Sequence, residues 1–411
     1  MLKNIIQNKK QKKIREKGFN LIEIILALAV ATLVFTAVFN FSTTAYVQLH
    51  QPDLPYDYFS YGYAQPYCLM NEKVGGIHLA SQFISLSSYI STSTRVTSVH
   101  SFGIQSLIVT ADSASTSEKD IFLFSIATTT GVISLISSID AGPGIQDSVL
   151  LGDFLYIANT SVNSHVKSFH INMTATGTAM FTELSNIRIA SLASSLSNPK
   201  KLSVYNQNLI LGSEKSNTGP ELFVIPIGID GVVRAIDSSI ELNGQLNQSL
   251  SAHEYLYVAN AADPELRVLT KSWQEFFSYD APLTLGNGKS LIFINPYIIL
   301  GRTLGSAELS LLHNSGTTTE VLDVKRTNGT VDFLQEFSSS VNSASSFLAI
   351  TANESKELQF WHIESSIFGP HIILDKDIDI PGRVTAYTCI SNTMYLFMSV
   401  NNQTILTWLN L

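Results

Sequence analysis

The sequence predicts one apolar helix near the N-terminus, followed by an all-β head folded as a seven-bladed β-propeller. Three observations support this fold class. Residues 24–41 contain no charged side chain and are long enough to span a bilayer as a helix. From residue 76 onward, short apolar runs alternate with Gly, Asn, Ser and Pro, which is typical of strands and turns. One apolar motif recurs seven times in that region, at intervals of 42 to 54 residues.

These features divide the chain into four parts. Residues 1–18 form a basic leader, and residues 19–50 are expected to form a single helix that ends before Pro52. Residues 51–75 are rich in Pro and Tyr without a helical period, which indicates a linker. Residues 76–411 are expected to form the propeller head.

The junction between leader and helix carries a specific motif. Seven basic residues precede Gly18-Phe19, and a single carboxylate, Glu23, follows within the first helical turns. A charge at the centre of a bilayer costs about 2.5–3.5 kcal/mol, so Glu23 requires a partner or a purpose. The pattern resembles the class III signal of type IV pilins and pseudopilins. That resemblance implies that a prepilin peptidase cuts between Gly18 and Phe19 and methylates the new amine, and that Glu23 neutralises the amine of a neighbouring subunit during filament assembly.

The resemblance covers about the first 50 residues and implies a location and a set of partners. Basic residues on one side of the helix place the leader in the cytoplasm and the head outside. The expected partners are the peptidase, the membrane, other pilin subunits through the helix, and an unknown extracellular ligand of the head. Many major pilins carry Pro where this chain has Asn40, so the resemblance favours a minor subunit in an adhesive pilus. The alternatives are a pseudopilin of a type II secretion or DNA-uptake system, and a membrane-tethered propeller hydrolase.

The charge balance argues against nucleic acid as a partner. The whole chain has a net charge of −8, and loss of the leader, with seven basic residues and one acidic residue, changes this to about −14. A surface of that sign repels nucleic acid and anionic lipid.

The repeated motif has the form Leu-x-hydrophobic-Ala/Gly and is followed by a polar turn and a second apolar strand. Its clearest copies, Leu155-Tyr-Ile-Ala-Asn and Leu256-Tyr-Val-Ala-Asn, resemble the Tyr-Val-Thr-Asn repeat of seven-bladed lactonase-like propellers. The second strand is apolar on both faces, as expected for a blade packed between two others. Two stacked β-domains and a β-solenoid are alternatives, and the uneven intervals count against the solenoid.

No residue pattern indicates catalysis, a metal or a cofactor, so we expect a protein that is not an enzyme. Gly288-Lys289-Ser290 resembles part of a phosphate-binding loop, but Leu283 occupies the position of the required first Gly, and a polar turn is expected instead. Asp375, Asp377 and Asp379 resemble the start of a calcium loop, but Ile380-Pro381 follows where a Gly is needed. We expect these three carboxylates to share the solvent face of an outer strand. No metal-ligand set of the lactonase-like propellers can be matched.

Two further expectations concern the closure of the ring. Cys68 and Cys389 both lie in the exported part, where one disulfide can form, although two buried free thiols remain the alternative. The last repeat ends soon after its third strand, so its fourth strand must come from elsewhere. We expect residues 77–90 to pair with residues 403–410 and supply that strand, because a bare sheet edge exposes unpaired backbone groups.

Overall fold

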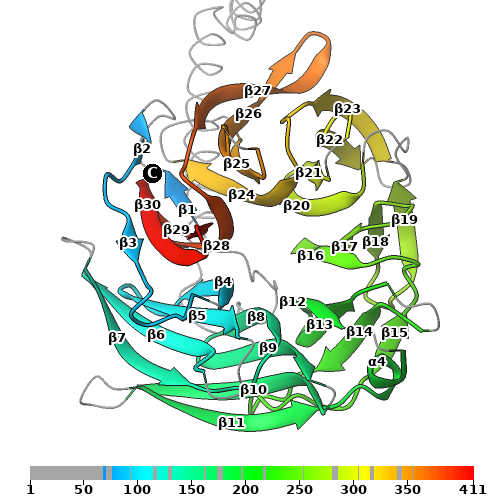
Figure 1. Cartoon of the computed structure of the whole chain (residues 1–411). Helices are drawn as coiled ribbons and strands as arrows, with labels where there is room; N and C mark the ends of the chain where they lie inside the picture. Colours follow the sequence, from blue (N-terminus) through cyan, green and yellow to red (C-terminus); the bar gives the residue numbers. More distant parts are fainter. Residues whose placement is uncertain are drawn as a thin grey trace, which may run out of the picture. The chain divides into compact units, whose positions relative to one another are not determined.

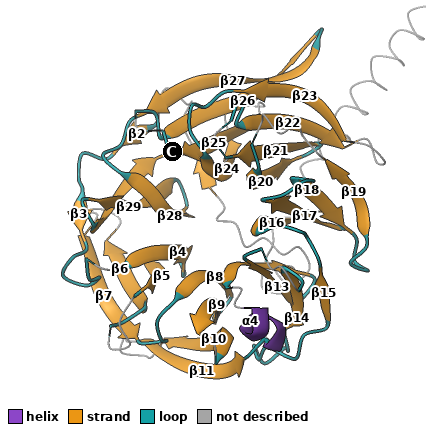
Figure 2. Cartoon of the chain, turned by 45° about the vertical axis from the view of Figure 1, so that its right-hand side comes forward, coloured by secondary structure: helices purple, strands orange, loops and turns teal. Residues whose placement is uncertain are grey.

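Seven small β-sheets are arranged around a ring in the computed structural model of the chain (Figures 1 and 2). The structure describes residues 68–70, 76–92, 94–113, 118–127, 132–161, 163–173, 179–195, 198–215, 219–252, 254–279, 286–303, 305–314, 319–339, 345–353 and 355–411. The expected N-terminal helix lies outside these residues, and so does most of the expected linker. The seven-bladed propeller is confirmed.

The first four blades are formed by consecutive strands, each sheet ordered from the inside of the ring outward. Blade 1 comprises β4 (Arg95–Ser101), β5 (Ser106–Asp112), β6 (Ile121–Ala127) and β7 (Val132–Ile139). Blade 2 comprises β8 (Ile145–Leu151), β9 (Phe154–Ser161), β10 (Ser164–Met173) and β11 (Ala179–Ile187), followed by the short helix α4 (Ala190–Ser195). Blade 3 comprises β12 (Pro199–Tyr205), β13 (Asn208–Ser213), β14 (Leu222–Pro226) and β15 (Ser238–Ile240). Blade 4 comprises β16 (Leu246–Ala252), β17 (Tyr255–Asn260), β18 (Leu266–Leu269) and β19 (Glu275–Tyr279).

The remaining blades follow the same plan until the last. Blade 5 comprises β20 (Gly288–Ile294), β21 (Tyr297–Arg302), β22 (Leu309–Asn314) and β23 (Thr319–Lys325). Blade 6 comprises β24 (Val331–Ser339), β25 (Ser346–Thr351), β26 (Leu358–Ser366) and β27 (Gly369–Ile378). Blade 7 has only β28 (Arg383–Ile390), β29 (Thr393–Val400) and β30 (Gln403–Asn410) from its own repeat. The repeated motif of the sequence therefore marks the second strand of each blade.

The core consists of seven apolar clusters, one between each pair of neighbouring blades. In β6, for example, Leu123 packs into the cluster shared with blade 2, whereas Phe122 and Phe124 pack into the cluster shared with blade 7. Side chains alternate between the faces of a strand, so a strand buried on both faces needs apolar residues at consecutive positions. This requirement explains the uninterrupted apolar runs of the sequence.

The missing strand of blade 7 comes from the N-terminal side of the head, as expected. Strands β2 (His78–Leu79) and β3 (Ile84–Ser85) both pair antiparallel with β30, with Leu79 opposite Leu409 and Ile84 opposite Leu406. The backbone N–H of Leu86 also donates to the carbonyl of Thr404 at 3.0 Å. We call residues 77–90 the latch, since they close the ring and pair with the last strand of the chain.

The stretch expected to be a linker contains one strand of the head. Strand β1 (Cys68–Met70) pairs in parallel with β24, the innermost strand of blade 6. Cys68 forms a disulfide with Cys389 of β28, which joins residues 321 positions apart with a Cα–Cα separation of 5.3 Å. Cys68 and Met70 are buried in the cluster between blades 6 and 7. The folded head therefore begins no later than Cys68. The sequence analysis placed its start at residue 76, which is several residues too late.

A buried polar residue immediately precedes the first apolar residue of the third strand in every blade. In most blades it is a carboxylate that accepts a backbone N–H from the segment after the fourth strand, as Glu221 does from Leu242 at 2.9 Å and Glu308 from Thr327 at 2.8 Å. In blade 2 the Nδ1 atom of His165 accepts from the backbone of Ile189 at 2.8 Å. The full set is Asp120, His165, Glu221, Glu265, Glu308, Glu357 and Thr404. The recurrence of this feature was present in the sequence but was not recognised there.

Candidate functional site

The inner rim of the ring is the most distinctive polar region of the head. Each innermost strand contains a β-bulge at the same place, where the pairing with the second strand skips one residue. A bulge bends the strand and redirects the side chain of the extra residue. All seven extra residues are polar or charged, and we call them the bulge ring: Thr97, Gln146, Lys200, Asn247, Lys289, Asp332 and Thr385.

The residues that follow the bulges hold neighbouring blades together. The Ser98 hydroxyl accepts the backbone N–H of Ser148 at 3.0 Å, and Asp147 accepts that of Leu202 at 2.9 Å. Gln248 accepts the backbone N–H of Leu291 at 2.9 Å and donates to its carbonyl at 3.1 Å. These contacts satisfy buried polar groups across blade boundaries, so the residues that follow the bulges stabilise the fold.

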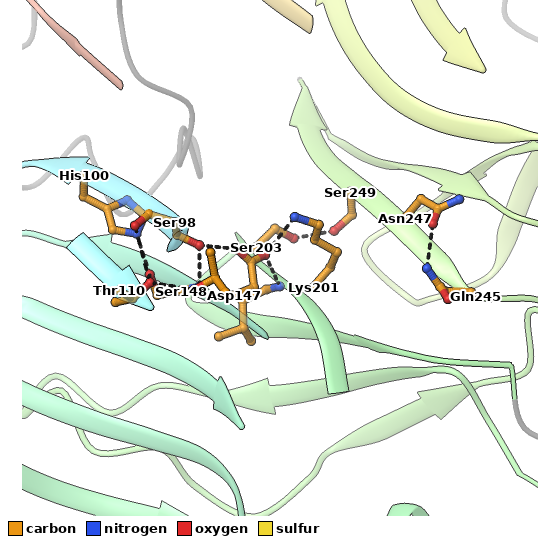
Figure 3. Close-up of polar contacts among 12 residues, drawn as sticks. Ser98, His100, Thr110, Asp147, Ser148, Lys201, Ser203, Gln245, Asn247 and Ser249 are labelled. Atoms are coloured by element: carbon orange, nitrogen blue, oxygen red, sulfur yellow. Dashed lines mark hydrogen bonds and ion pairs between the residues drawn. The ribbon is translucent and has the colours of Figure 1, made fainter. Parts of the chain in front are cut away.

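Inner strands of blades 1 to 3 share a continuous polar network (Figure 3). Asp147 accepts a hydrogen bond from the Ser98 hydroxyl at 2.5 Å and lies 3.6 Å from the Lys201 ammonium. The Nε2 atom of His100 contacts the Ser148 hydroxyl at 2.8 Å, and that hydroxyl also contacts Thr110 at 3.0 Å.

Burial lowers the pKa of His100 to about 4, even though the charge of Asp147 acts to raise it. The imidazole is therefore neutral at physiological pH and a weak base. Within the described residues, no hydrogen bond joins its Nδ1 atom to a carboxylate, as a catalytic triad would require. The pair of His100 and Ser148 has the contacts of a structural network.

Cationic side chains lie within the bulge ring and beside it. Lys200 pairs with Glu214 at 2.8 Å, and Arg383 pairs with Asp332 through two nitrogens at 3.0 and 2.7 Å. Lys289 lies on the bulge of β20, and its side chain is half-buried. The sequence-based interpretation of Gly288-Lys289-Ser290 as a turn was wrong, because these residues begin the innermost strand of blade 5.

A hollow of about 810 Å³ lies at the boundary between blades 6 and 7. Arg383 lines it together with the carboxylates of Glu357 and Asp379, and Phe83 of the latch forms part of its wall. Burial raises the pKa of Glu357, and the neighbouring Asp379 acts in the same direction. The hollow therefore carries both signs of charge close to Arg383.

The three aspartates at the end of blade 6 do not share one face, contrary to the sequence-based expectation. A bulge at Asp375 interrupts the alternation of β27, and Asp379 lies beyond the strand. Asp375 contacts His362 at 2.9 Å and Asp377 pairs with Lys356 at 2.7 Å, so these two carboxylates have different partners. In the part of the chain that the structure describes, no group of three or more His, Cys, Asp or Glu residues could hold a metal ion.

The innermost strand β24 carries a carboxyl group whose titration can be tested. The side chain of Glu336 is exposed to solvent, but the surrounding chain reduces its hydration and raises its pKa to about 7. Because the folded state holds this proton more tightly than the unfolded state, Glu336 lowers stability as the pH rises from about 4.5 to 7. Glu336→Gln should therefore melt like the parent protein at pH 5 and at a higher temperature at pH 8. Equal differences in Tm at both pH values would contradict this assignment.

Gly18, Phe19 and Glu23 lie outside the described residues, so their roles stay predictions. None of the helices within the described residues has the length and hydrophobicity of a membrane span. Cys68 and Cys389 are joined by a disulfide at the inner edge of blades 6 and 7.

The sequence reasoning missed the bulge ring, for which the only local signal is a polar residue at the second or third position of each innermost strand.

Comparisons with known proteins define the fold class. No protein-family model and no curated protein sequence matches the chain. Among solved structures, a provisionally assigned 6-phosphogluconolactonase from Bacteroides uniformis is similar, with a TM-score of 0.55 at 11% identity over 73% of this chain and 91% of that one. Its counterpart from Bacteroides fragilis has a TM-score of 0.53 at 13% identity, covering 75% and 95% of the two chains.

Virginiamycin B lyase from Staphylococcus aureus is also similar, with a TM-score of 0.51 at 13% identity over 82% of this chain and 99% of the lyase. At these identities the likeness concerns the fold alone. The head is a seven-bladed β-propeller with lactonase-like structural neighbours.

Proposed function

We propose that this protein is a minor type IV pilin-like subunit that presents a propeller head for adhesion or ligand binding. The observation that carries the proposal is the N-terminal pattern, in which a basic leader, Gly18-Phe19, Glu23 and an apolar run follow in order. The protein would be stored in the plasma membrane with its leader in the cytoplasm and its head outside. Its partners would be the prepilin peptidase and other pilin subunits.

Two features of the head support the proposal that it is an exported binding module. A disulfide between Cys68 and Cys389 suits an oxidising compartment. The latch pairs with blade 7 and β1 pairs with blade 6. Backbone pairing and the Cys68–Cys389 disulfide therefore hold the N-terminal end of the head in place. The residues best placed to bind a ligand are those of the bulge ring and its cationic neighbours, and we propose no catalytic role.

Processing at the N-terminus provides the test. We expect the mature protein to begin at Phe19 with a methylated amine, as measured by mass spectrometry of the purified membrane form. Gly18→Leu should leave the full-length protein in the membrane. Glu23→Val should leave the membrane pool intact and reduce recovery in sheared filaments, because a neighbour's amine would lose its counter-charge in a low-dielectric core. An intact Met1 in the mature protein would refute the proposal.

The two alternatives predict different results. A pseudopilin of a type II secretion or DNA-uptake system would be processed in the same way, but its loss would impair secretion or DNA uptake instead of adhesion. A membrane-tethered hydrolase would turn over a lactone or phosphate ester. The hydrogen bond between His100 and Ser148 is the contact at which this alternative can be tested. Activity abolished by Ser148→Ala would support that alternative.

A further inference from the structure

Lys289 is the cation of the inner rim that lacks a counter-ion. Among the described residues, its ammonium makes no ion pair and no side-chain hydrogen bond, although the charge of Asp332 on the following blade acts on it. Two nitrogens of Arg383 donate to one carboxylate oxygen of Asp332, Oδ2, at 3.0 and 2.7 Å. A partly dehydrated ammonium without a counter-ion is unfavourable in a folded protein.

Three other cations lie on innermost strands of the ring, and their charges act on Lys289. Burial lowers the pKa of Lys289, and the charges of Lys201, Arg383 and Lys200 lower it further, whereas Asp332 acts in the opposite direction. These cations come from three blades: Lys200 and Lys201 from blade 3, Lys289 from blade 5 and Arg383 from blade 7. Their innermost strands β12, β20 and β28 all border the axis of the ring (Figure 1).

Three of these four cations have a carboxylate partner. Lys200 pairs with Glu214, Lys201 lies 3.6 Å from Asp147, and Arg383 pairs with Asp332, so among the described residues only Lys289 of the four makes no ion pair. Lys201 and Arg383 are also 36% and 62% exposed, which leaves their nitrogens free to make further contacts. Mutual repulsion and the dehydration of Lys289 would both be relieved by a bound anion.

We propose that the inner rim binds a ligand through a carboxylate or phosphate group held by Lys289, with Lys200, Lys201 and Arg383 around it. The proposal deepens the proposed function by naming the chemistry of the ligand, and it rests on the head acting as a binding module. Lysine ammonium groups would contact the anion as point charges, and the Arg383 guanidinium would offer it a planar pair of donors. The ligand would approach along the axis of the ring, which the innermost strands border.

The probes are inorganic phosphate and citrate, compared with chloride at equal ionic strength, with the full-length protein in detergent. At low ionic strength, at least one probe should raise the Tm and give a saturable calorimetric titration, and added salt should weaken binding. Lys289→Met should raise the Kd about tenfold or more, which corresponds to the loss of one charge-assisted hydrogen bond. Binding of phosphate alone would identify a phosphate ester as the ligand class, and binding of citrate alone would identify a carboxylate.

The matched control is Lys271→Met, which removes an exposed lysine of blade 4 that pairs with Glu254 and is not part of the proposed site. It should bind the probes as the parent protein does. Without ligand, Lys289→Met should melt no lower than the parent, since it removes a dehydrated charge; if it does not fold, Lys200→Met takes its place with the same expected loss of affinity. The proposal is overturned if neither probe stabilises the protein beyond chloride, or if Lys289→Met binds as tightly as the parent. Normal processing at Phe19 in that case would leave the filament proposal standing.

Discussion

A chain truncated to begin at Thr92 should be insoluble or should melt far below a chain that begins at Tyr67. The truncation removes β1, the latch and Cys68, and it leaves β30 as an open edge with unpaired backbone groups. It also uncovers the cluster between blades 7 and 1, into which Leu86 and Ile90 are packed at 0% and 1% exposure. The measurement is the Tm of the two purified chains by calorimetry or circular dichroism.

Point variants separate the contributions to this effect. Leu86→Ala should lower stability by about 2–5 kcal/mol, as expected for truncation of a fully buried leucine. Phe83→Ala on the same segment is the matched control, because Phe83 is 44% exposed and should contribute far less. Replacing both Cys68 and Cys389 by Ser should lower stability by about 2–4 kcal/mol. Equal melting of the Thr92 and Tyr67 chains would show that the latch does not close the ring.

Arg302→Met should destabilise the head by about 3–5 kcal/mol, which is the usual effect of removing one partner from a buried ion pair. Arg302 of β21 is 0% exposed, and its Nη1 atom lies 3.6 Å from the Glu265 carboxylate of blade 4, itself 1% exposed. The guanidinium also donates to the Ser310 hydroxyl and to the Gly286 carbonyl, both at 3.2 Å. Loss of Arg302 would leave the Glu265 carboxylate buried between two blades with less compensation.

A double-mutant cycle makes this prediction specific. Glu265→Gln alone should also be strongly destabilising, and the double variant with Arg302→Met should be less so than the sum of the two single variants. The matched control is the exposed pair of Lys271 and Glu254 at 3.2 Å, where Lys271→Met should change stability by less than about 1 kcal/mol. Urea denaturation of the four variants supplies the measurement. If Arg302→Met is no more destabilising than Lys271→Met, the ion pair does not hold blades 4 and 5 together.

Sequence periodicity was enough to predict the blades because each blade must bury the same strand on both faces. The second strand keeps consecutive apolar residues, as in β9 and β17, and the interval between copies reports the length of one four-stranded unit. The latch was predictable for a related reason: the last repeat stops after its third strand, and a closed ring does not tolerate an open edge. Both inferences follow from local patterns that every repeat obeys.

The arrangement of the inner rim was not predictable in the same way. A bulge is a mismatch between the residue counts of two paired strands, so Lys289 and Lys200 cannot be recognised as equivalent until the register is known. For the same reason Gly288-Lys289-Ser290 was interpreted as a turn, and Asp375, Asp377 and Asp379 were assigned to one face. Each error came from applying an ideal alternation to a strand that contains an extra residue.

The sequence by itself determined the all-β head, the number of blades, the closure of the ring and the N-terminal motif around Gly18 and Glu23, because these depend on periodicity and on neighbouring residues along the chain. Only the tertiary structure decided that Cys68 enters the ring beside β24, that Arg302 meets Glu265 across a blade boundary, and that Lys289 shares the rim with Lys200, Lys201 and Arg383. These contacts join residues from different blades, and the closed ring brings together side chains that lie about 35 to more than 300 positions apart in the chain.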